Sequence, residues 1–292
     1  MPRAGIVTVA GKPNVGKSTL LNRIVGQKLS ITSPKPQSTR DRIVGIYTTE
    51  DSQVVILDTP GLLNPKYPLQ QAMRSTAVRA LEEADVIVYL ADATEGLPPS
   101  LSEAAELSSP PKAPVVVALN KSDALNSVRR EELTSNVGIV LISALTGDGI
   151  QDLMARVAQL LPESPFLYPE DEISTQPIRF FVAELVRETV LEQLHDEVPY
   201  SVAVQVEEYR EGRSPLYIRA VIYVERESQK AIIIGGKGAR IRSIGEAARK
   251  KIETLVGEKV YLDLWVKVLA NWRKNPGSLS RFGYQLVTGK GK

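Results

Sequence analysis

The residues with the clearest chemical meaning run from Gly11 to Ser18 and read G-K-P-N-V-G-K-S. They fit the pattern G-x-x-x-x-G-K-[ST], in which a glycine-rich loop points successive backbone N–H groups at a polyphosphate. Lys17 is placed to reach the β- and γ-phosphates, and the Ser18 hydroxyl to bind Mg²⁺. Residues 6–10 predict a buried strand before the loop, and residues 19–25 a helix after it, as this motif requires. An ordinary glycine-rich turn is the alternative that this context disfavours.

A second loop predicts which base is bound. Asn120-Lys121-Ser122-Asp123 follows an apolar run over residues 115–119 that suits a buried parallel strand. A carboxylate such as Asp123 can accept hydrogen bonds from guanine N1–H and the exocyclic amine together, and adenine has no such pair of donors. We expect Asn120 to brace the loop and the Lys121 stem to cover the base. Ser143-Ala144-Leu145 follows another strand-like run, over residues 137–142, and the Ala144 N–H is expected to meet guanine O6.

A third loop completes a predicted metal site. Asp58-Thr59-Pro60-Gly61 follows a buried strand over residues 54–57, so we expect Asp58 to hold Mg²⁺ through water and the Gly61 N–H to sense the γ-phosphate. Thr39 is the candidate for a second hydroxyl ligand that leaves when the γ-phosphate leaves. A simple D-x-P-G turn and a surface threonine are the competing interpretations.

The predicted nucleotide site therefore draws on four separate parts of the chain. The expected GTP-binding residues are Gly11, Lys12, Pro13, Asn14, Val15, Gly16, Lys17, Ser18, Thr19, Asp58, Thr59, Pro60, Gly61, Leu62, Asn120, Lys121, Ser122, Asp123, Ser143, Ala144 and Leu145, with Ser18, Thr39 and Asp58 as the metal ligands.

Short apolar runs alternate with helical stretches, such as residues 68–83 and 149–161, and this alternation indicates an α/β fold. The four elements, in this order, resemble those of P-loop GTPases related to translation factors, over about residues 4–162. That resemblance implies a doubly wound, mostly parallel sheet with the nucleotide at the carboxyl ends of the strands.

Composition limits the other possibilities. The 292 residues are enough for two domains, and the absence of cysteine excludes disulfides and thiolate metal sites. The chain has a single histidine, His195, which we expect to lie exposed at the end of a helix rather than bind zinc. No apolar run approaches the roughly 18 residues that a spanning helix needs. No signal peptide is recognisable, and we expect a cytoplasmic protein.

A proline-rich, acidic stretch over residues 161–172 predicts a linker, and we place the domain boundary between residues 173 and 174. Residues 1–173 carry 16 basic and 20 acidic side chains, whereas residues 230–292 carry 14 and 4. Concentrated positive charge suits a polyanion, although a solvated surface without a partner would look the same. The second part reads helix, strand, strand, helix, G-x-x-G, helix, strand.

The G-x-x-G tetrapeptide runs from Gly235 to Gly238 and joins two predicted helices. Without Cβ atoms such a loop lets a nucleic-acid backbone approach closely, while a plain glycine turn is the alternative. The element order resembles that of type II KH domains, whose usual ligand is single-stranded RNA. The expected RNA contacts are Ile234, Gly235, Gly236, Lys237, Gly238, Arg240 and Arg242.

A GTPase domain followed by such a KH domain resembles the Era family nearly end to end. The resemblance rests on the phosphate loop, Gln37-Ser38-Thr39-Arg40, the Asp58 and Asn120 loops, Ile234 to Gly238 and Leu264-Trp265-Val266-Lys267-Val268. Ser38 stands where the family usually has threonine, a departure that leaves Thr39 in place. The resemblance implies GTP hydrolysis by a monomer. It also implies binding to the 3′ end of 16S rRNA during assembly of the 30S ribosomal subunit, and peripheral association with the membrane.

The residue after Gly61 bears on the expected rate of GTP hydrolysis. Many small GTPases have a glutamine there that orients the attacking water, whereas this chain has Leu62, so we expect slow unaided hydrolysis. In GTPases that resemble this one, the residue at Asn14 can help hold K⁺ beside the phosphates; a loop-bracing role for Asn14 is the equal alternative. The residues expected to act on phosphoryl transfer are Asn14, Lys17, Thr39 and Gly61.

Three classes of function stay open at this point. The first is a GTPase that binds RNA under nucleotide control, because GTP would order residues 28–42 and 62–67. The second is a GTPase whose basic domain serves a membrane or protein partner. The third, an ATP-using P-loop enzyme, is disfavoured by Asn120 and Asp123.

Overall fold

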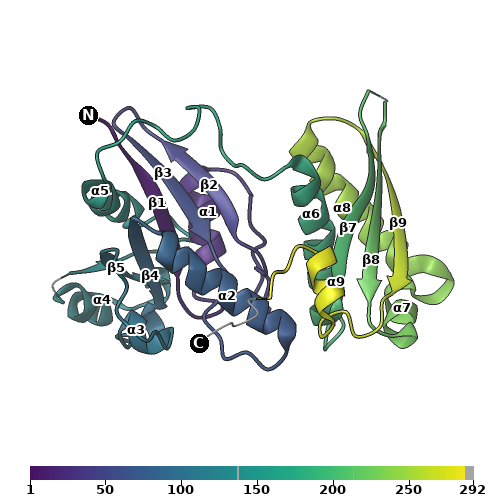
Figure 1. The fold of residues 1–292 in the computed structure, drawn as a ribbon, viewed down its shortest axis with the longest axis horizontal. Helices are drawn as coiled ribbons and strands as arrows, with labels where there is room; N and C mark the ends of the chain where they lie inside the picture. The colour runs from purple at the N-terminus through teal and green to yellow at the C-terminus, as the bar shows by residue number, and fades with distance from the viewer. Residues whose placement is uncertain (137, 213, 287–292) are drawn as a thin grey trace. The chain divides into compact units, whose positions relative to one another are not determined.

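The computed structural model describes residues 1–136, 138–212 and 214–286. The chain forms two compact units, one made of residues 1–66 and 70–175 and the other of residues 67–69 and 176–292 (Figure 1). Each unit has its own sheet and is described separately below. Within the described ranges, no helix combines the length and the apolar character needed to cross a bilayer.

The first unit is built on a six-stranded sheet. The strands are β1 (Arg3–Ala10), β2 (Ile43–Thr48), β3 (Ser52–Asp58), β4 (Val86–Asp92), β5 (Val115–Asn120) and β6 (Ile139–Leu141), in the spatial order β2-β3-β1-β4-β5-β6. All neighbours pair in parallel except β2, which runs antiparallel to β3. Consecutive residues of β4 are buried, and because alternate side chains face opposite sides, both faces of the sheet are covered. The predicted α/β class is confirmed.

Five α-helices among the described residues pack on this sheet. They are α1 (Lys17–Val25), α2 (Pro68–Glu83), α3 (Leu101–Ala104), α4 (Ser127–Thr134) and α5 (Ile150–Leu160). Helix α1 begins two residues before the predicted start and ends at Gly26, whose left-handed backbone (φ 74°) caps it. Strand β6 is shorter than predicted, and residue 137, where that prediction began, lies outside the described residues.

The predicted linker is held against the first unit instead of running free. The Gln53 side-chain oxygen on β3 accepts from the backbone N–H groups of Leu167 and Tyr168, at 2.7 and 2.9 Å. Further on, the Ile46 N–H of β2 donates to Ile173 O at 2.9 Å. The acidic, proline-containing stretch therefore follows β2 and β3, which is why the first unit extends to residue 175.

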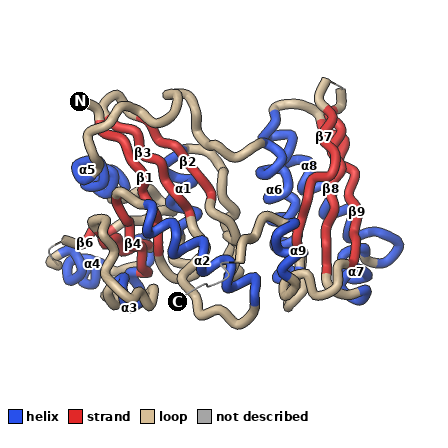
Figure 2. The backbone as a smooth tube through the Cα atoms, in the orientation of Figure 1, coloured by secondary structure: helices blue, strands red, loops and turns tan. Residues whose placement is uncertain are grey.

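The described residues of the second unit form three strands and four α-helices, and their arrangement can be followed in Figure 2. They follow the order α6 (Ile178–Gln193), β7 (Ala203–Arg210), β8 (Leu216–Val224), α7 (Glu227–Ile234), α8 (Ala239–Val256), β9 (Val260–Val268) and α9 (Pro276–Arg281). Strand β8 pairs antiparallel with β7 and parallel with β9. The order predicted up to β9 is confirmed, while α9 was not predicted because six residues are too few to show a helical period.

The core of this unit joins the helices to one face of the sheet. Its fully buried members include Val186, Val190, Ile218, Ile222, Ile244, Ala248 and Ile252. Ile244, Ala248 and Ile252 form the stripe predicted for α8, with Ile241 partly buried beside them. The same helix leaves Arg240, Arg242, Arg249 and Lys250 exposed.

Truncating the α8 stripe should destabilise the second unit. Ile252→Ala removes three carbons from a fully buried site and should lower the free energy of unfolding by about 2–5 kcal/mol. Both tryptophans, Trp265 and Trp272, lie in this unit, so their fluorescence reports its unfolding in denaturant. The exposed neighbour Thr254→Ala is the matched control and should cost no more than about 0.5 kcal/mol. Equal losses for the two variants would contradict this packing.

Candidate functional site

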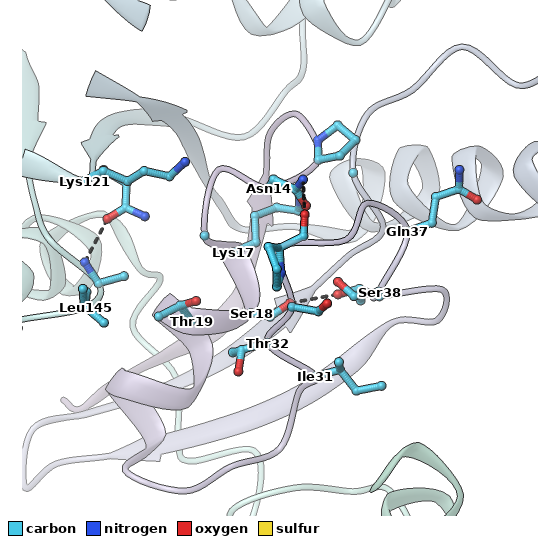
Figure 3. Close-up of a pocket in the computed structure, with 18 of the residues that line it drawn as sticks. Asn14, Lys17, Ser18, Thr19, Ile31, Thr32, Gln37, Ser38, Lys121 and Leu145 are labelled. Carbon is cyan, nitrogen blue, oxygen red and sulfur yellow. Dashed lines mark hydrogen bonds between the residues drawn. The ribbon is translucent and has the colours of Figure 1, made fainter. Parts of the chain in front are cut away.

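A cavity of about 660 Å³ lies at the carboxyl ends of the parallel strands of the first unit. Its lining includes twelve predicted GTP-binding residues, namely Pro13, Asn14, Gly16, Lys17, Ser18, Thr19, Gly61, Asn120, Lys121, Asp123, Ala144 and Leu145, together with the predicted metal ligand Thr39. Lys121 and Leu145 lie at one end of it and Gln37 and Ser38 at the other, with Lys17 and Ser18 between them (Figure 3). The fold thus gathers the four separate sequence elements around one space.

The positively charged side chain of the phosphate loop, that of Lys17, lies inside the site. Lys17 is buried, and its Nζ donates to the backbone oxygens of Gly11 and Lys12 at 3.2 and 2.9 Å. Burial lowers the pKa of Lys17 to about 8, and the nearby Asp58 carboxylate partly opposes that shift. The lysine is therefore held among groups of the loop itself, where an incoming polyphosphate would supply the missing negative charge.

The three predicted metal ligands meet at one corner. Ser18 Oγ donates to Asp58 Oδ2 at 2.7 Å and lies 2.8 Å from Thr39 Oγ1. A serine hydroxyl has a single proton, so Thr39 must be the donor in the second contact. Burial raises the pKa of Asp58, while Lys17 and the surrounding hydroxyls hold it down.

This corner suits a hydrated magnesium ion. Mg²⁺ prefers oxygen ligands and keeps several of its waters, so two hydroxyls and a carboxylate that acts through water meet its needs. Asp58 Oδ1 is buried and accepts no hydrogen bond among the described residues. A metal-bound water would donate to that oxygen, and the donor set therefore fits the ion.

Asn120, which we expected to brace its own loop, also joins the phosphate loop to the Ala144 loop. Its Nδ2 donates to Val15 O at 2.7 Å, and its Oδ1 accepts from the Ala144 N–H at 2.8 Å. A Cβ on Gly16 would stand 2.3 Å from Asn120 Nδ2, and Gly16 also has a φ of +98°, so only glycine fits there. The Ala144 N–H, expected to meet guanine O6, is engaged by Asn120 in this structure.

The carboxylate expected to recognise the base is held in place by its neighbours. Ser143 Oγ donates to Asp123 Oδ1 at 2.5 Å, and Asp123 lines the cavity. Lys121 Nζ pairs with Asp92 Oδ2 at 2.6 Å, and this pairing helps hold the pKa of Asp92 below its usual value. Sequence reasoning missed Asp92, although its place at the end of a buried strand could have indicated it.

A second supporting residue gave no sequence signal. Arg23, in the last turn of α1, donates to the backbone oxygens of Ala144 and Leu145. It therefore anchors the loop that the base is expected to meet. Nothing in the sequence around Arg23 separates it from an exposed helical arginine.

Two residues that bear on the expected mechanism of hydrolysis have defined surroundings. Leu62 is buried with Leu81, Ile87 and Tyr89 in an apolar cluster, so its side chain is committed to the core. The side chain of Asn14 donates to Pro34 O at 2.9 Å, which supports the loop-bracing interpretation.

The G-x-x-G turn of the second unit is open to solvent. A Cβ built on Gly236 or Gly238 would meet nothing within 4 Å, and Lys237 between them is exposed. Arg240 and Arg242, in the first turn of α8, are exposed as well. A phosphate backbone could therefore lie directly on this turn.

Exposed charge on α8 continues beyond the turn, with one exception. Arg249 and Lys250 are exposed, whereas Lys251 is committed to helix α6. Its Nζ lies 2.9 Å from Glu188 Oε2 and 2.7 Å from Glu192 Oε2. Lys251 is therefore a structural cation and does not belong to the exposed basic surface.

Comparison with known families agrees with these two sites. The family described as "50S ribosome-binding GTPase" matches residues 6–121, and the family described as "KH domain" matches residues 197–273. The first match contains the phosphate loop and the Asp58 loop and ends at Lys121, before Asp123 and residues 143–145, whereas the second contains the whole G-x-x-G turn and α8.

Whole-chain relatives extend the likeness to both units. GTPase Era of Carboxydothermus hydrogenoformans is 41% identical to this chain, over 97% of this chain and 98% of its own length. GTPase Era of Thermosipho melanesiensis is 45% identical, over 93% of this chain and 94% of its own length.

Among solved structures, an Aquifex aeolicus Era variant bound to GDP and AlF₄⁻ matches with a TM-score of 0.90 and 42% identity, covering 97% of this chain and all of that one. Era in complex with MgGDPNP and nucleotides 1506–1542 of 16S ribosomal RNA matches with a TM-score of 0.91 and 41% identity, covering 98% and 100%. With identities above 40% over nearly the whole length, this chain belongs to the Era family of GTPases.

Proposed function

We propose that this GTPase, acting as a monomer, couples guanine-nucleotide binding to recognition of single-stranded ribosomal RNA at the 3′ end of 16S rRNA, and so assists assembly of the small ribosomal subunit. The observation that carries the proposal is that the phosphate, metal and base elements line one cavity, while an open G-x-x-G turn heads a basic helix. The solved relative that holds both MgGDPNP and a 16S rRNA segment supports the same pairing.

In the proposed complex the base and the phosphates occupy opposite ends of the cavity. Asp123 accepts from the guanine ring and Lys121 covers its face, while Lys17 and the loop amides hold the β- and γ-phosphates. Magnesium, held by Ser18, Thr39 and Asp58, would neutralise charge on the phosphate oxygens. The Gly61 N–H then contacts the γ-phosphate; a Cβ at this position would lie 2.7 Å from Pro13 N, so glycine is required.

Asp123→Asn tests base selection. The amide loses one acceptor and presents a donor to the donors of guanine, so GDP affinity should fall about ten- to a hundredfold. Xanthine has a carbonyl in place of the exocyclic amine, so affinity for xanthosine diphosphate should rise in the same variant. Isothermal titration of GDP, xanthosine diphosphate and ADP in Mg²⁺ measures both changes. Unaltered preference for GDP would remove Asp123 from base recognition, and Lys17→Ala, which should lose every nucleotide, is the control.

Hydrolysis needs a group other than Leu62 to stabilise the developing charge. We propose that K⁺, held partly by Asn14 Oδ1, supplies it beside the phosphates, where an arginine would stand in other GTPases. The Asn14 amide nitrogen already bonds to Pro34 O, and this contact orients the side chain without using its oxygen.

Exchanging K⁺ for Na⁺ tests this role. The initial rate of GTP hydrolysis should rise about tenfold or more in K⁺, because one charge-stabilising group is worth on the order of 10²–10³ in rate. Asn14→Ala should remove the difference between the two cations. If both cations give equal rates in the unaltered protein, Asn14 only braces the loop.

The second unit would hold RNA by its backbone at the glycine turn and by charge along α8. Phosphates lie on Gly236 and Lys237 in this arrangement, while Arg240 and Arg242 add positive potential from the adjoining helical turn. The half-buried Ile234 offers an apolar edge for a base beside the turn.

Reversing the charge at the turn should abolish RNA binding. Gly236→Asp with Lys237→Asp places two carboxylates against the phosphates, so affinity for a single-stranded oligonucleotide of the 16S rRNA 3′ end should fall by about a hundredfold or more. Fluorescence anisotropy at fixed salt measures it. Lys259→Asp, beyond the far end of α8, is the matched control and should retain RNA binding. Equal losses in both would mean that non-specific charge, and not the turn, holds the RNA.

The anisotropy assay also tests whether the nucleotide controls RNA binding and whether a membrane surface competes with RNA. Affinity measured with GDP and with a non-hydrolysable GTP analogue tests nucleotide control, which requires different affinities in the two states. Anionic vesicles offered in competition test the alternative partner of the basic helix, a membrane surface to which the protein would bind peripherally. Displacement of the RNA by vesicles would favour that partner.

A further inference from the structure

A buried serine outside the predicted site supports the metal corner from behind. Ser30 is 1% exposed, and its Oγ donates to Asp58 Oδ2 at 2.6 Å. Ser18 donates to the same oxygen at 2.7 Å from the cavity side. Asp58 Oδ2 thus receives two hydroxyl protons, while Oδ1 receives none from the described residues.

Ser30 is itself fixed by one side chain of helix α1. Asn22 Oδ1 accepts from the N–H groups of Leu29 and Ser30, both at 2.9 Å, and Asn22 Nδ2 donates to Ser30 O at 2.8 Å. These three bonds hold the backbone of Ser30 on both sides of its Cα. The helix that begins with Lys17 and Ser18 therefore also sets the position of Ser30.

Binding of a metal ion would affect the bonds of Ser18 and of Ser30 to Asp58 differently. The lone pair of Ser18 that accepts from Thr39 is the one a metal ion would take. Thr39 and Ser30 both lie within residues 28–42, the stretch expected to respond to the nucleotide state, but Ser30 is near the start of that stretch and is bonded to Asn22 of α1. Ser30 does not line the cavity, and its hydroxyl donates to Asp58 from the side away from the expected ion. Its bond to Asp58 can therefore persist while the bonds on the cavity side are exchanged.

We propose that Ser30, clamped by Asn22, is a positioning residue for Mg²⁺: it fixes Asp58 so that the unpartnered Oδ1 faces the water shell of the ion. The inference rests on the proposed nucleotide and magnesium site. Hydrogen bonds to a buried carboxylate are among the stronger ones in proteins, because both the charge and the low local polarity favour them. Removing this bond should free the carboxylate to rotate and weaken the hold on the ion, with little effect on contacts to the base.

The test measures release of GDP carrying a fluorescent N-methylanthraniloyl group from the full chain while Mg²⁺ is titrated against a chelator. In Ser30→Ala, the Mg²⁺ concentration that half-maximally slows release should rise about tenfold, as expected for one charge-assisted bond. Release in chelator alone should match the unaltered protein, because base and phosphate contacts remain. An unchanged Mg²⁺ midpoint would overturn the inference.

Three further variants make the result specific. Ser30→Thr keeps the hydroxyl and should restore the midpoint, and a shift as large as that of the alanine variant would show that the hydroxyl is not responsible. Asn22→Ala should move the midpoint in the same direction, because it releases the backbone of Ser30. Ser52→Ala removes a buried hydroxyl at the opposite end of β3 and should leave the midpoint in place.

Failure of the broader proposal would look different. If the unaltered protein bound the labelled GDP without any response to Mg²⁺, or did not bind it, the proposed nucleotide site would fail before Ser30 was tested. If the unaltered protein responded and Ser30→Ala responded identically, only the role of Ser30 would fail.

Discussion

One buried amide holds the nucleotide site together. Asn120 bonds to the phosphate loop through Val15 O and to the base loop through the Ala144 N–H, and it packs so closely on Gly16 that no side chain fits there. A buried amide of this kind is costly to leave unpaired, so the two loops must keep their spacing. That spacing has to match the distance between the base and the phosphates of one nucleotide, and Asn120 helps to fix it.

The metal corner is held together by the pairing of its buried polar groups. Lys17 and Asp58 have opposite charges, and each offsets part of the burial penalty of the other. Hydroxyls of Ser18 and Ser30 supply the protons that the carboxylate requires. These bonds fix the oxygens that a metal ion and its water shell would meet.

The sequence predicted the site residues that belong to motifs of known chemistry. It did not predict residues that support the site through contacts made only in the folded chain. Lys17, Asn120 and Gly236 lie in motifs with fixed spacing, and the strand-to-helix context that predicted them is the one observed. Asp92, Arg23 and Ser30 belong to no motif, because their partners are far away in sequence: Ser30 and Asp58 are 28 residues apart, and Arg23 and Ala144 are 121 apart. Helix α9 was missed because it is too short for a periodic pattern.

The burial of Leu62 constrains how hydrolysis can be catalysed. Its side chain packs with Leu81 and Tyr89, and its N–H bonds to Gly11 O at 3.0 Å, so both the backbone and the side chain at this position are fixed. A glutamine in this place would have to bury its amide in an apolar cluster, at a cost of roughly 1–3 kcal/mol, or turn the loop outward and break the bond to Gly11. Either arrangement would bring the amide to the attacking water only at a cost in folding free energy. Charge stabilisation from the phosphate-loop side of the cavity, where Asn14 and Lys17 lie, asks nothing of this position and is therefore compatible with the burial of Leu62.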